Sequence, residues 1–215
     1  MPYELVIFDN DGVLVDSEPI ANRILAGYLT EIGHPTTYED SIRDFLGAAL
    51  HRVHDLVRER TGKRLPEGFD QEYHARLFAA YDQELRAVDG VGVVLEKLAV
   101  DGVPFCLASS GAHERIRRAL RTTGLYDRFT EGRIFSAQDV GRGKPAPDLF
   151  LHAARTMGVA PERCAVVEDS PLGVQAARAA GMDVFGFTAM TPAERLAAAT
   201  GRFRSMADLP GLLSR

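Results

Sequence analysis

The chain has 215 residues, a hydrophobic content of 46% and a formal net charge of −5, values that are ordinary for a packed globular protein and give no sign of disorder. The negative charge provides no basic field, so we expect no binding to nucleic acid. A site for an anionic substrate would therefore need local cations from a lysine, from helix N-termini or from a metal.

The cysteines and the hydropathy pattern indicate the compartment. Cys106 and Cys164 lie in apolar runs, and their spacing fits neither a zinc site nor a dense disulfide framework. We expect buried free thiols in a reducing compartment. No charged start precedes a long apolar segment, and no stretch approaches the roughly 20 apolar residues of a membrane span. The sequence therefore predicts a cytoplasmic protein with no membrane partner.

The first predicted element is a buried strand over residues 5–8, which ends at Asp9 and Asp11 and is followed by Gly12. Strands of a parallel sheet read as unbroken apolar runs, and the ligand crevice lies beyond their carboxyl ends. The two aspartates are therefore candidates for an acidic site. The alternative is an Asp-Gly turn that closes a hairpin, but residues 13–15 lack the alternation of a strand partner.

The next part of the chain carries helical periodicity and no convincing strand. A first helix opens at Ser17 and Glu18 and ends at Gly33, and two more amphipathic segments cover residues 50–61 and 69–85. An ordinary crossover between parallel strands needs only a dozen or so residues. These helices therefore exceed one crossover and indicate an inserted module.

We place the boundaries of this inserted helical module at residues 16–87. The remaining residues, 1–15 and 88–215, would form the α/β core domain.

Beyond residue 88 the chain alternates between helices and strands. We expect strands over residues 103–108, 133–136, 164–167 and 183–187, helices over residues 93–100, 113–124 and 173–180, a helix after the turn-rich residues 141–148, and terminal helices over residues 193–199 and 207–213. This alternation is typical of a doubly wound sheet. The predicted fold class is thus α/β, with a Rossmann-like, mostly parallel sheet and an all-helical insertion.

Polar side chains follow three of the predicted strands, and a lysine lies in a fourth loop. They are Asp9 and Asp11, Ser109 and Ser110, Glu168 and Asp169, and Lys144. In a doubly wound sheet these positions face one crevice. Gathered carboxylates suit Mg²⁺, which also takes phosphate oxygens, while a lysine and a hydroxyl suit the charge of a phosphoryl group. The set predicts phosphoryl transfer with an aspartate as nucleophile.

Each member also has an ordinary interpretation. Ser109 could cap the next helix, Lys144 could be an exposed turn lysine, and the acidic pair at residues 168–169 could complement a helix dipole. Lys144, however, precedes Pro145, where the constrained backbone favours a placed side chain. We expect the peptide bond before Pro145 to be cis.

Taken in order, four motifs resemble those of the haloacid dehalogenase-like hydrolase superfamily, in its phosphatase and β-phosphoglucomutase-like branch with a helical cap. The motifs are residues 9–18 (DNDGVLVDSE), Ser109, residues 143–148 (GKPAPD) and residues 167–170 (VEDS). The resemblance covers essentially the whole chain, and the motifs are specific as a set.

The resemblance implies a role for each acidic residue. Asp9 would attack phosphorus in line and form an aspartyl phosphate. Asp11 would protonate the leaving oxygen and then activate the attacking water. The Asp9 side chain, the Asp11 backbone carbonyl and Asp169 would hold Mg²⁺, with Glu168 close by.

The resemblance also implies how the phosphoryl oxygens are bound. Ser109 would donate a hydrogen bond, Lys144 would neutralise charge, and backbone N–H groups after Asp9 and Ser109, at Asn10 and Ser110, would complete the cradle. Asn10 is polar where we expect an apolar or small residue, but only its backbone is required.

Two cap positions favour hydrolysis over mutase chemistry. A β-phosphoglucomutase carries a histidine and a phosphate-binding arginine in its cap, and the corresponding residues here are Ala21 and Leu50. We therefore predict a phosphatase of a sugar phosphate or phosphosugar acid. A phosphoacceptor signalling domain also combines acidic residues, a hydroxyl and a lysine, but it lacks a long helical insert.

The cap of such enzymes contributes substrate contacts. The candidates here are Gly47, His51, Arg52, Tyr73 and Arg76. A solvated helix face is the alternative for each. The segment at residues 81–90 is similar to the bacterial 6-phosphogluconate phosphatase type, which favours sugar acids or sugars. We expect a monomer.

Overall fold

The computed structural model describes residues 2–47, 50–129 and 132–214. The chain forms two compact units, a larger one of Met1–Asp16 with Arg86–Arg215 and a helical one of Ser17–Leu85. This division lies close to the predicted boundary at residues 16–87. That the two units act as a catalytic core and a cap stays a prediction.

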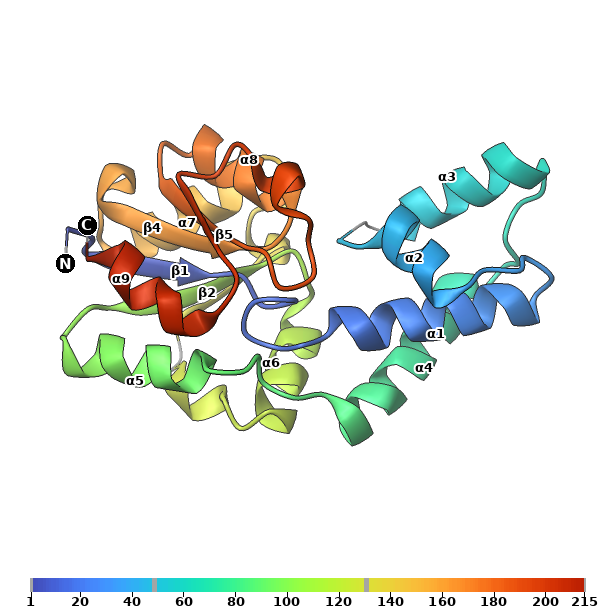
Figure 1. Ribbon diagram of the computed structural model, residues 1–215, viewed down its shortest axis with the longest axis horizontal. Coiled ribbons are helices and arrows are strands. Elements are labelled where there is room, and N and C mark those ends of the chain that lie inside the picture. The colour runs from blue at the N-terminus through green and yellow to red at the C-terminus, as the bar shows by residue number, and fades with distance from the viewer. Residues whose placement is uncertain (1, 48–49, 130–131, 215) are drawn as a thin grey trace. The chain divides into compact units, whose positions relative to one another are not determined.

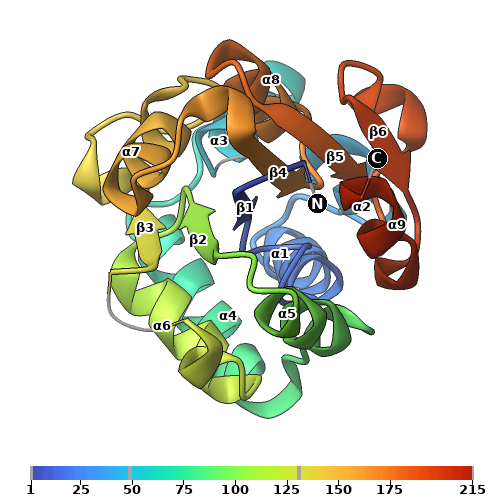
Figure 2. The ribbon, with the colours of Figure 1, turned by 90° about the vertical axis from the view of Figure 1, so that its left-hand side faces the viewer.

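A parallel sheet forms the centre of the larger unit (Figure 2). Within the described residues it has six strands in the order β3-β2-β1-β4-β5-β6, and each neighbouring pair is parallel. The strands are β1 (Leu5–Phe8), β2 (Phe105–Ser109), β3 (Ile134–Ser136), β4 (Cys164–Glu168), β5 (Asp183–Phe187) and β6 (Gly201–Phe203). The predicted α/β fold is confirmed, and β1 lies between the two strands that end at Ser109 and Glu168.

Helices cover both faces of this sheet. They are α5 (Val91–Val100), α6 (His113–Thr122), α7 (Asp148–Met157), α8 (Pro171–Ala179) and α9 (Leu209–Leu213). Figures 1 and 2 show α5 and α6 on one face and α7 and α8 on the other. The core on the α7 and α8 side includes Cys106 and Cys164, which are buried free thiols as predicted.

The C-terminal segment differs from the prediction. Instead of a helix over residues 193–199, the chain forms a short 3-10 helix, Ala193–Leu196, and then strand β6. Leu196 is the one residue of that 3-10 helix that is buried, so the alanine-rich run has helical propensity but no apolar stripe to pack. β6 has three residues, too few to show the period of a strand.

The helical unit contains α1 (Glu18–Glu31), α2 (Tyr38–Phe45), α3 (Leu50–Thr61) and α4 (Phe69–Glu84). Three of them match the predicted segments, and α2 was not predicted. Thr37 begins α2 with a capping box, in which its hydroxyl accepts from Asp40 N and the Asp40 carboxylate accepts from Thr37 N. Only Ser41 and Phe45 of α2 are buried, which explains its weak apolar pattern.

The chain leaves and re-enters the larger unit at adjacent positions. The N–H of Asp16 donates to the carbonyl of Arg86 at 2.9 Å, and the N–H of Val88 donates to Leu14 at 3.0 Å. Val15 and Ala87 form an antiparallel bridge. Backbone hydrogen bonds therefore join the two ends of the insertion within the larger unit.

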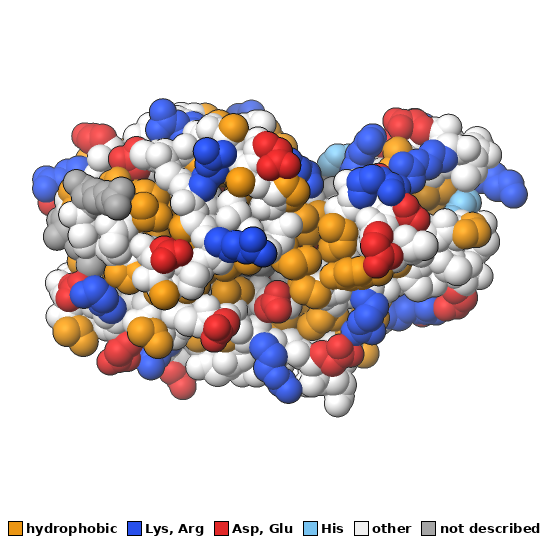
Figure 3. Space-filling view, viewed as in Figure 1, with side chains coloured by type: hydrophobic (Ala, Val, Ile, Leu, Met, Phe, Trp, Pro, Cys, Tyr) orange, Lys and Arg blue, Asp and Glu red, His pale blue; other side chains and the backbone are white. Residues whose placement is uncertain are grey.

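Charged side chains of both signs are interspersed on the visible face of the larger unit (Figure 3). Among the described helices, none combines the length and the apolar character that crossing a bilayer requires. The expected monomer, the cytoplasmic location and the lack of nucleic-acid binding stay predictions.

Candidate active site

Lys144 connects the first and the last of the predicted acidic motifs. Its Nζ donates to Asp9 Oδ1 at 2.7 Å and to Glu168 Oε1 at 2.6 Å, and it also contacts the carbonyl of Ala108 at 3.3 Å. The lysine side chain is 6% exposed, and its peptide bond to Pro145 is cis, as predicted. The interpretation of Lys144 as an exposed turn lysine is therefore wrong.

Burial and charge act on the ionisation of this group in opposite directions. The pKa of Asp9 is raised to about 7: burial is the largest cause, the attraction of Lys144 opposes it, and the carboxylates of Glu168 and Asp11 add to it. Burial works to lower the pKa of Lys144, but Asp9 and Glu168 outweigh it and raise that pKa above its ordinary value. Lys144 therefore remains a cation, while Asp9 is poised between its two protonation states near neutral pH.

Glu168 is held on both carboxylate oxygens. One binds Lys144, and the other accepts from the N–H and the hydroxyl of Ser170 at 2.8 and 2.9 Å. The Ser170 hydroxyl in turn accepts from Gly173 N in the first turn of α8. A Cβ at Gly173 would lie 1.7 Å from Glu168 Oε1, so α8 can approach this carboxylate only with glycine there.

Asp169 completes an acidic cluster with Asp9 and Glu168. One oxygen from each residue lies within 4.8 Å of the others, and all three residues are buried. Gly12 makes room for Asp169, because a Cβ at Gly12 would lie 2.0 Å from Asp169 Oδ2, and its φ of +74° favours glycine. Buried carboxylate oxygens at this spacing fit a hard divalent cation such as Mg²⁺.

The predicted phosphate-binding residues follow β1 and β2. Ser109 is buried, and its hydroxyl accepts from Gly111 N at 3.0 Å, whereas the residue before α6 is Ala112. Ser109 thus shapes its own loop and does not cap α6. Ser110 is exposed. The Asn10 side chain is fully buried, and its polar atoms have no hydrogen-bond partner among the described residues.

Arg115 of α6 also contacts the site, although the sequence pattern does not predict it. Its Nη2 lies 2.5 Å from Asp11 Oδ2. The sequence does not distinguish Arg115 from its neighbours, because the same helix also carries Arg117, Arg118 and Arg121.

The predicted substrate residues of the helical unit fall into two groups. Arg76 is engaged inside that unit, by Glu31 and Glu72 at 2.6 to 3.0 Å and by the face of the Tyr28 ring. Tyr73 is buried and donates to the carbonyl of Ala21 at 3.4 Å. Gly47, His51 and Arg52 are exposed. A role in substrate binding stays a prediction for all five.

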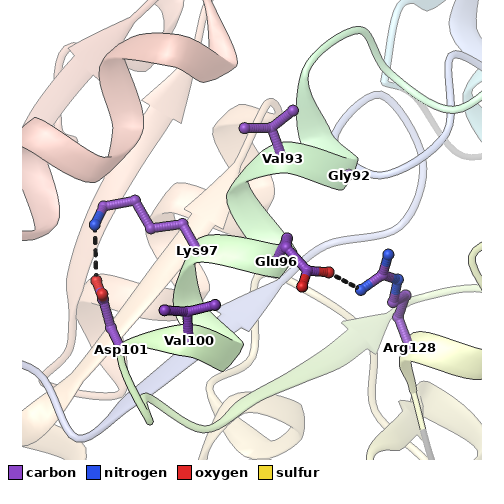
Figure 4. Close-up of a pocket in the computed structure, with 7 residues that line it drawn as sticks. All are labelled: Gly92, Val93, Glu96, Lys97, Val100, Asp101 and Arg128. Atoms are coloured by element: carbon purple, nitrogen blue, oxygen red, sulfur yellow. Dashed lines mark hydrogen bonds and ion pairs between the residues drawn. The ribbon is translucent and has the colours of Figure 1, made fainter.

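A separate pocket lies on α5 and contains none of the predicted residues (Figure 4). Its lining residues are Gly92, Val93, Glu96, Lys97, Val100, Asp101 and Arg128. The charged ones pair with each other, Glu96 with Arg128 and Lys97 with Asp101. This pocket lacks an unpaired charge for a phosphoryl group, so the acidic cluster is the better candidate.

The chain is similar to known proteins over most of its length. The family model described as haloacid dehalogenase-like hydrolase matches residues 3–181. The 6-phosphogluconate phosphatase of Escherichia coli (strain K12) is 34% identical over 187 residues, which cover 86% of this chain and 83% of the relative.

Two solved structures share the whole fold. A conserved haloacid dehalogenase-like protein of unknown function from Agrobacterium tumefaciens superposes with a TM-score of 0.90 at 38% identity, covering 99% of this chain and 98% of that one. A HAD family hydrolase from Deinococcus radiodurans R1, crystallised with bound phosphate and sodium, has a TM-score of 0.83 at 32% identity, covering 99% and 96%.

Proposed function

The chain belongs to the haloacid dehalogenase-like hydrolases, and from this premise we propose that it is a Mg²⁺-dependent phosphatase that acts through an aspartyl phosphate on Asp9. That the chain is a phosphoric monoester hydrolase follows from the family and its phosphatase relatives. The observation that supports the proposed mechanism through Asp9 is the buried Lys144 cation between Asp9 and Glu168.

The proposed reaction has two steps. In the first, a carboxylate oxygen of Asp9 forms a bond to phosphorus while the bond to the ester oxygen breaks, and Asp11 gives its proton to that oxygen. In the second, Asp11 takes a proton from water as the water oxygen attacks phosphorus, which releases phosphate and restores Asp9. Lys144 remains charged in both steps and offsets negative charge on Asp9 and the phosphoryl group.

The acidic cluster would hold the metal. We assign Mg²⁺ to the carboxylates of Asp9 and Asp169 and the backbone carbonyl of Asp11, with Glu168 close by, because the cluster supplies the hard oxygen donors that this ion prefers. When bound, the ion would neutralise charge on the phosphoryl oxygens.

We expect Mg²⁺ to bind more weakly as the pH falls below about 7. The pKa of Asp9, which faces Lys144, Glu168 and Asp11, is raised to about 7, and a protonated carboxylate is a poor ligand. Well below this pKa, the affinity should fall by up to about tenfold per pH unit. Calorimetric titration of the protein with Mg²⁺ between pH 5.5 and 8.5 measures this dependence.

Asp9→Asn is the control for this titration. It removes the titrating carboxylate, so its weaker Mg²⁺ binding should vary much less with pH in this range. A wild-type affinity that stays constant from pH 5.5 to 8.5 would contradict the assignment.

We propose a sugar phosphate or a phosphosugar acid as the substrate. The names of two relatives, 6-phosphogluconate phosphatase and hexitol phosphatase A, support this class. Ala21 and Leu50 stand where a mutase would place its histidine and its arginine for a second phosphate, which favours hydrolysis over isomerisation.

A panel of phosphate esters tests this proposal. It contains sugar phosphates, phosphosugar acids, phosphoglycolate and nucleotides, with phosphate release measured in the presence of Mg²⁺. We expect the fastest release from a sugar phosphate or phosphosugar acid. A coupled assay that finds isomerisation of β-glucose 1-phosphate faster than phosphate release would favour a mutase, and a long-lived phosphoprotein without turnover would favour a phosphoacceptor domain.

A further inference from the structure

Asp11 and Arg115 form an ion pair at the edge of the candidate site. Arg115 Nη2 lies 2.5 Å from Asp11 Oδ2, and the two side chains are 25% and 18% exposed. The pair joins the loop after β1 to helix α6, which follows β2. Among the described residues, Arg115 is the one cation that pairs with Asp11.

The loop that precedes α6 is shaped to receive this guanidinium. A Cβ at Gly111 would lie 2.8 Å from Arg115 Nη2 and 2.9 Å from its Nε, so a larger residue would displace the arginine. The Gly111 backbone is fixed on both sides, because its N–H donates to Ser109 Oγ at 3.0 Å and its carbonyl accepts from Ser136 Oγ at 2.6 Å. Arg115 therefore packs against a backbone segment that two hydrogen bonds hold in place.

Asp11 needs such a partner because its surroundings repel it. Its carboxylate is close enough to Asp9 to raise the pKa of that group by charge repulsion. Lys144, the other cation of the site, is occupied by Asp9 and Glu168. Arg115 therefore supplies the positive charge beside Asp11 that Lys144 does not.

We propose that Arg115 is a positioning residue for proton transfer. Its guanidinium holds Oδ2 of Asp11, so that the other oxygen, Oδ1, exchanges the proton with the leaving group and the water. This inference rests on the proposed function, in which Asp11 is the acid and base. Arg115 acts through Asp11 and not on the phosphoryl group.

Substrates with different leaving groups distinguish a role of Arg115 in proton transfer from a purely structural role. An alkoxide needs protonation as it leaves, whereas p-nitrophenolate is stable without it. The value of kcat/KM reports steps up to the first irreversible one, here the phosphorylation of Asp9.

In the Arg115→Ala variant we expect kcat/KM to fall about 10- to 100-fold for the best alkyl phosphate of the panel. For p-nitrophenyl phosphate it should fall less than about threefold. Arg115→Lys should recover part of the loss, since lysine restores the positive charge but not the planar guanidinium group.

A double-mutant cycle with Asp11→Asn tests the same inference independently. If Arg115 acts through Asp11, Arg115→Ala should add no further loss in the Asp11→Asn background. Arg117→Ala, at an exposed position of the same helix, is the matched control and should leave both substrates unaffected. Retained p-nitrophenyl phosphatase activity also shows that the variant is folded.

Three results would overturn the inference while leaving the phosphatase intact. They are an equal loss on both substrates, no loss on the alkyl phosphate, and losses that add in the double variant. Wild-type protein that releases no phosphate from any ester would overturn the proposed function and, with it, this inference.

Discussion

Asp9→Asn is expected to abolish phosphate release, with a fall in kcat of at least about 1000-fold. The amide has almost the shape of the carboxylate and can still accept the hydrogen bond that Lys144 Nζ donates to Oδ1. It has no negative charge, however, and is a poor nucleophile toward phosphorus. Phosphate release from the best substrate of the panel, at saturating Mg²⁺, measures the effect.

The matched control is Asp127→Asn, an exposed aspartate of the same unit, which should retain wild-type turnover. Phosphate trapped by acid quench during turnover should be bound to the wild-type chain, be released by hydroxylamine as expected for an acyl phosphate, and be absent from Asp9→Asn. Turnover that survives in Asp9→Asn would show that another residue is the nucleophile.

Lys144→Met is expected to damage both catalysis and stability. It leaves the buried carboxylates of Asp9 and Glu168 without their shared cation. Removing one partner of a buried ion pair typically costs about 3–5 kcal/mol, and loss of one charge-stabilising group costs about 100-fold or more in rate. Urea unfolding and phosphate release measure the two effects.

The loss of stability should depend on pH in a defined direction. Lys144 lowers the pKa of Asp9, so its removal raises the folded-state pKa further above the unfolded value. The folded state then binds more protons than the unfolded state, and stability falls as the pH rises from about 4 through the folded-state pKa. The deficit of Lys144→Met, measured without Mg²⁺, should therefore be larger at pH 8 than at pH 5.

Lys97→Met is the control for Lys144→Met. The Lys97 side chain is 49% exposed and pairs with Asp101 on the surface of α5, where such pairs contribute about 1 kcal/mol or less. Equal effects of the two substitutions on unfolding would mean that the buried bridge at Lys144 does not stabilise the fold.

The acidic strand ends could be predicted because two simple rules converge on them. β1 and β4 are unbroken apolar runs that end at Asp9 and at Glu168, and parallel strands bring their carboxyl ends to one edge of the sheet. The cluster of Asp9, Glu168 and Asp169 needed no information beyond these rules.

Other features could not be predicted because they depend on partners distant in sequence. Arg115 is one of several arginines on α6, and its partner Asp11 lies 104 residues away in the sequence. Arg76 carries a charge that suggests a ligand, yet its nearest partner from another helix, Glu31, is 45 residues away. α2 and β6 are short and bury few residues, so their patterns are weak.

The hydrogen bonds at Asp16 and Arg86 make the helical unit an exchangeable module. Because the chain departs and returns at neighbouring residues, a segment of another length or sequence could be spliced between them with little disturbance to β1 or its aspartates. The entropy of closing a longer loop grows only with the logarithm of its length. If the helical unit contacts the substrate as predicted, substrate choice can diverge through the inserted segment while the hydrolytic chemistry of the larger unit stays the same.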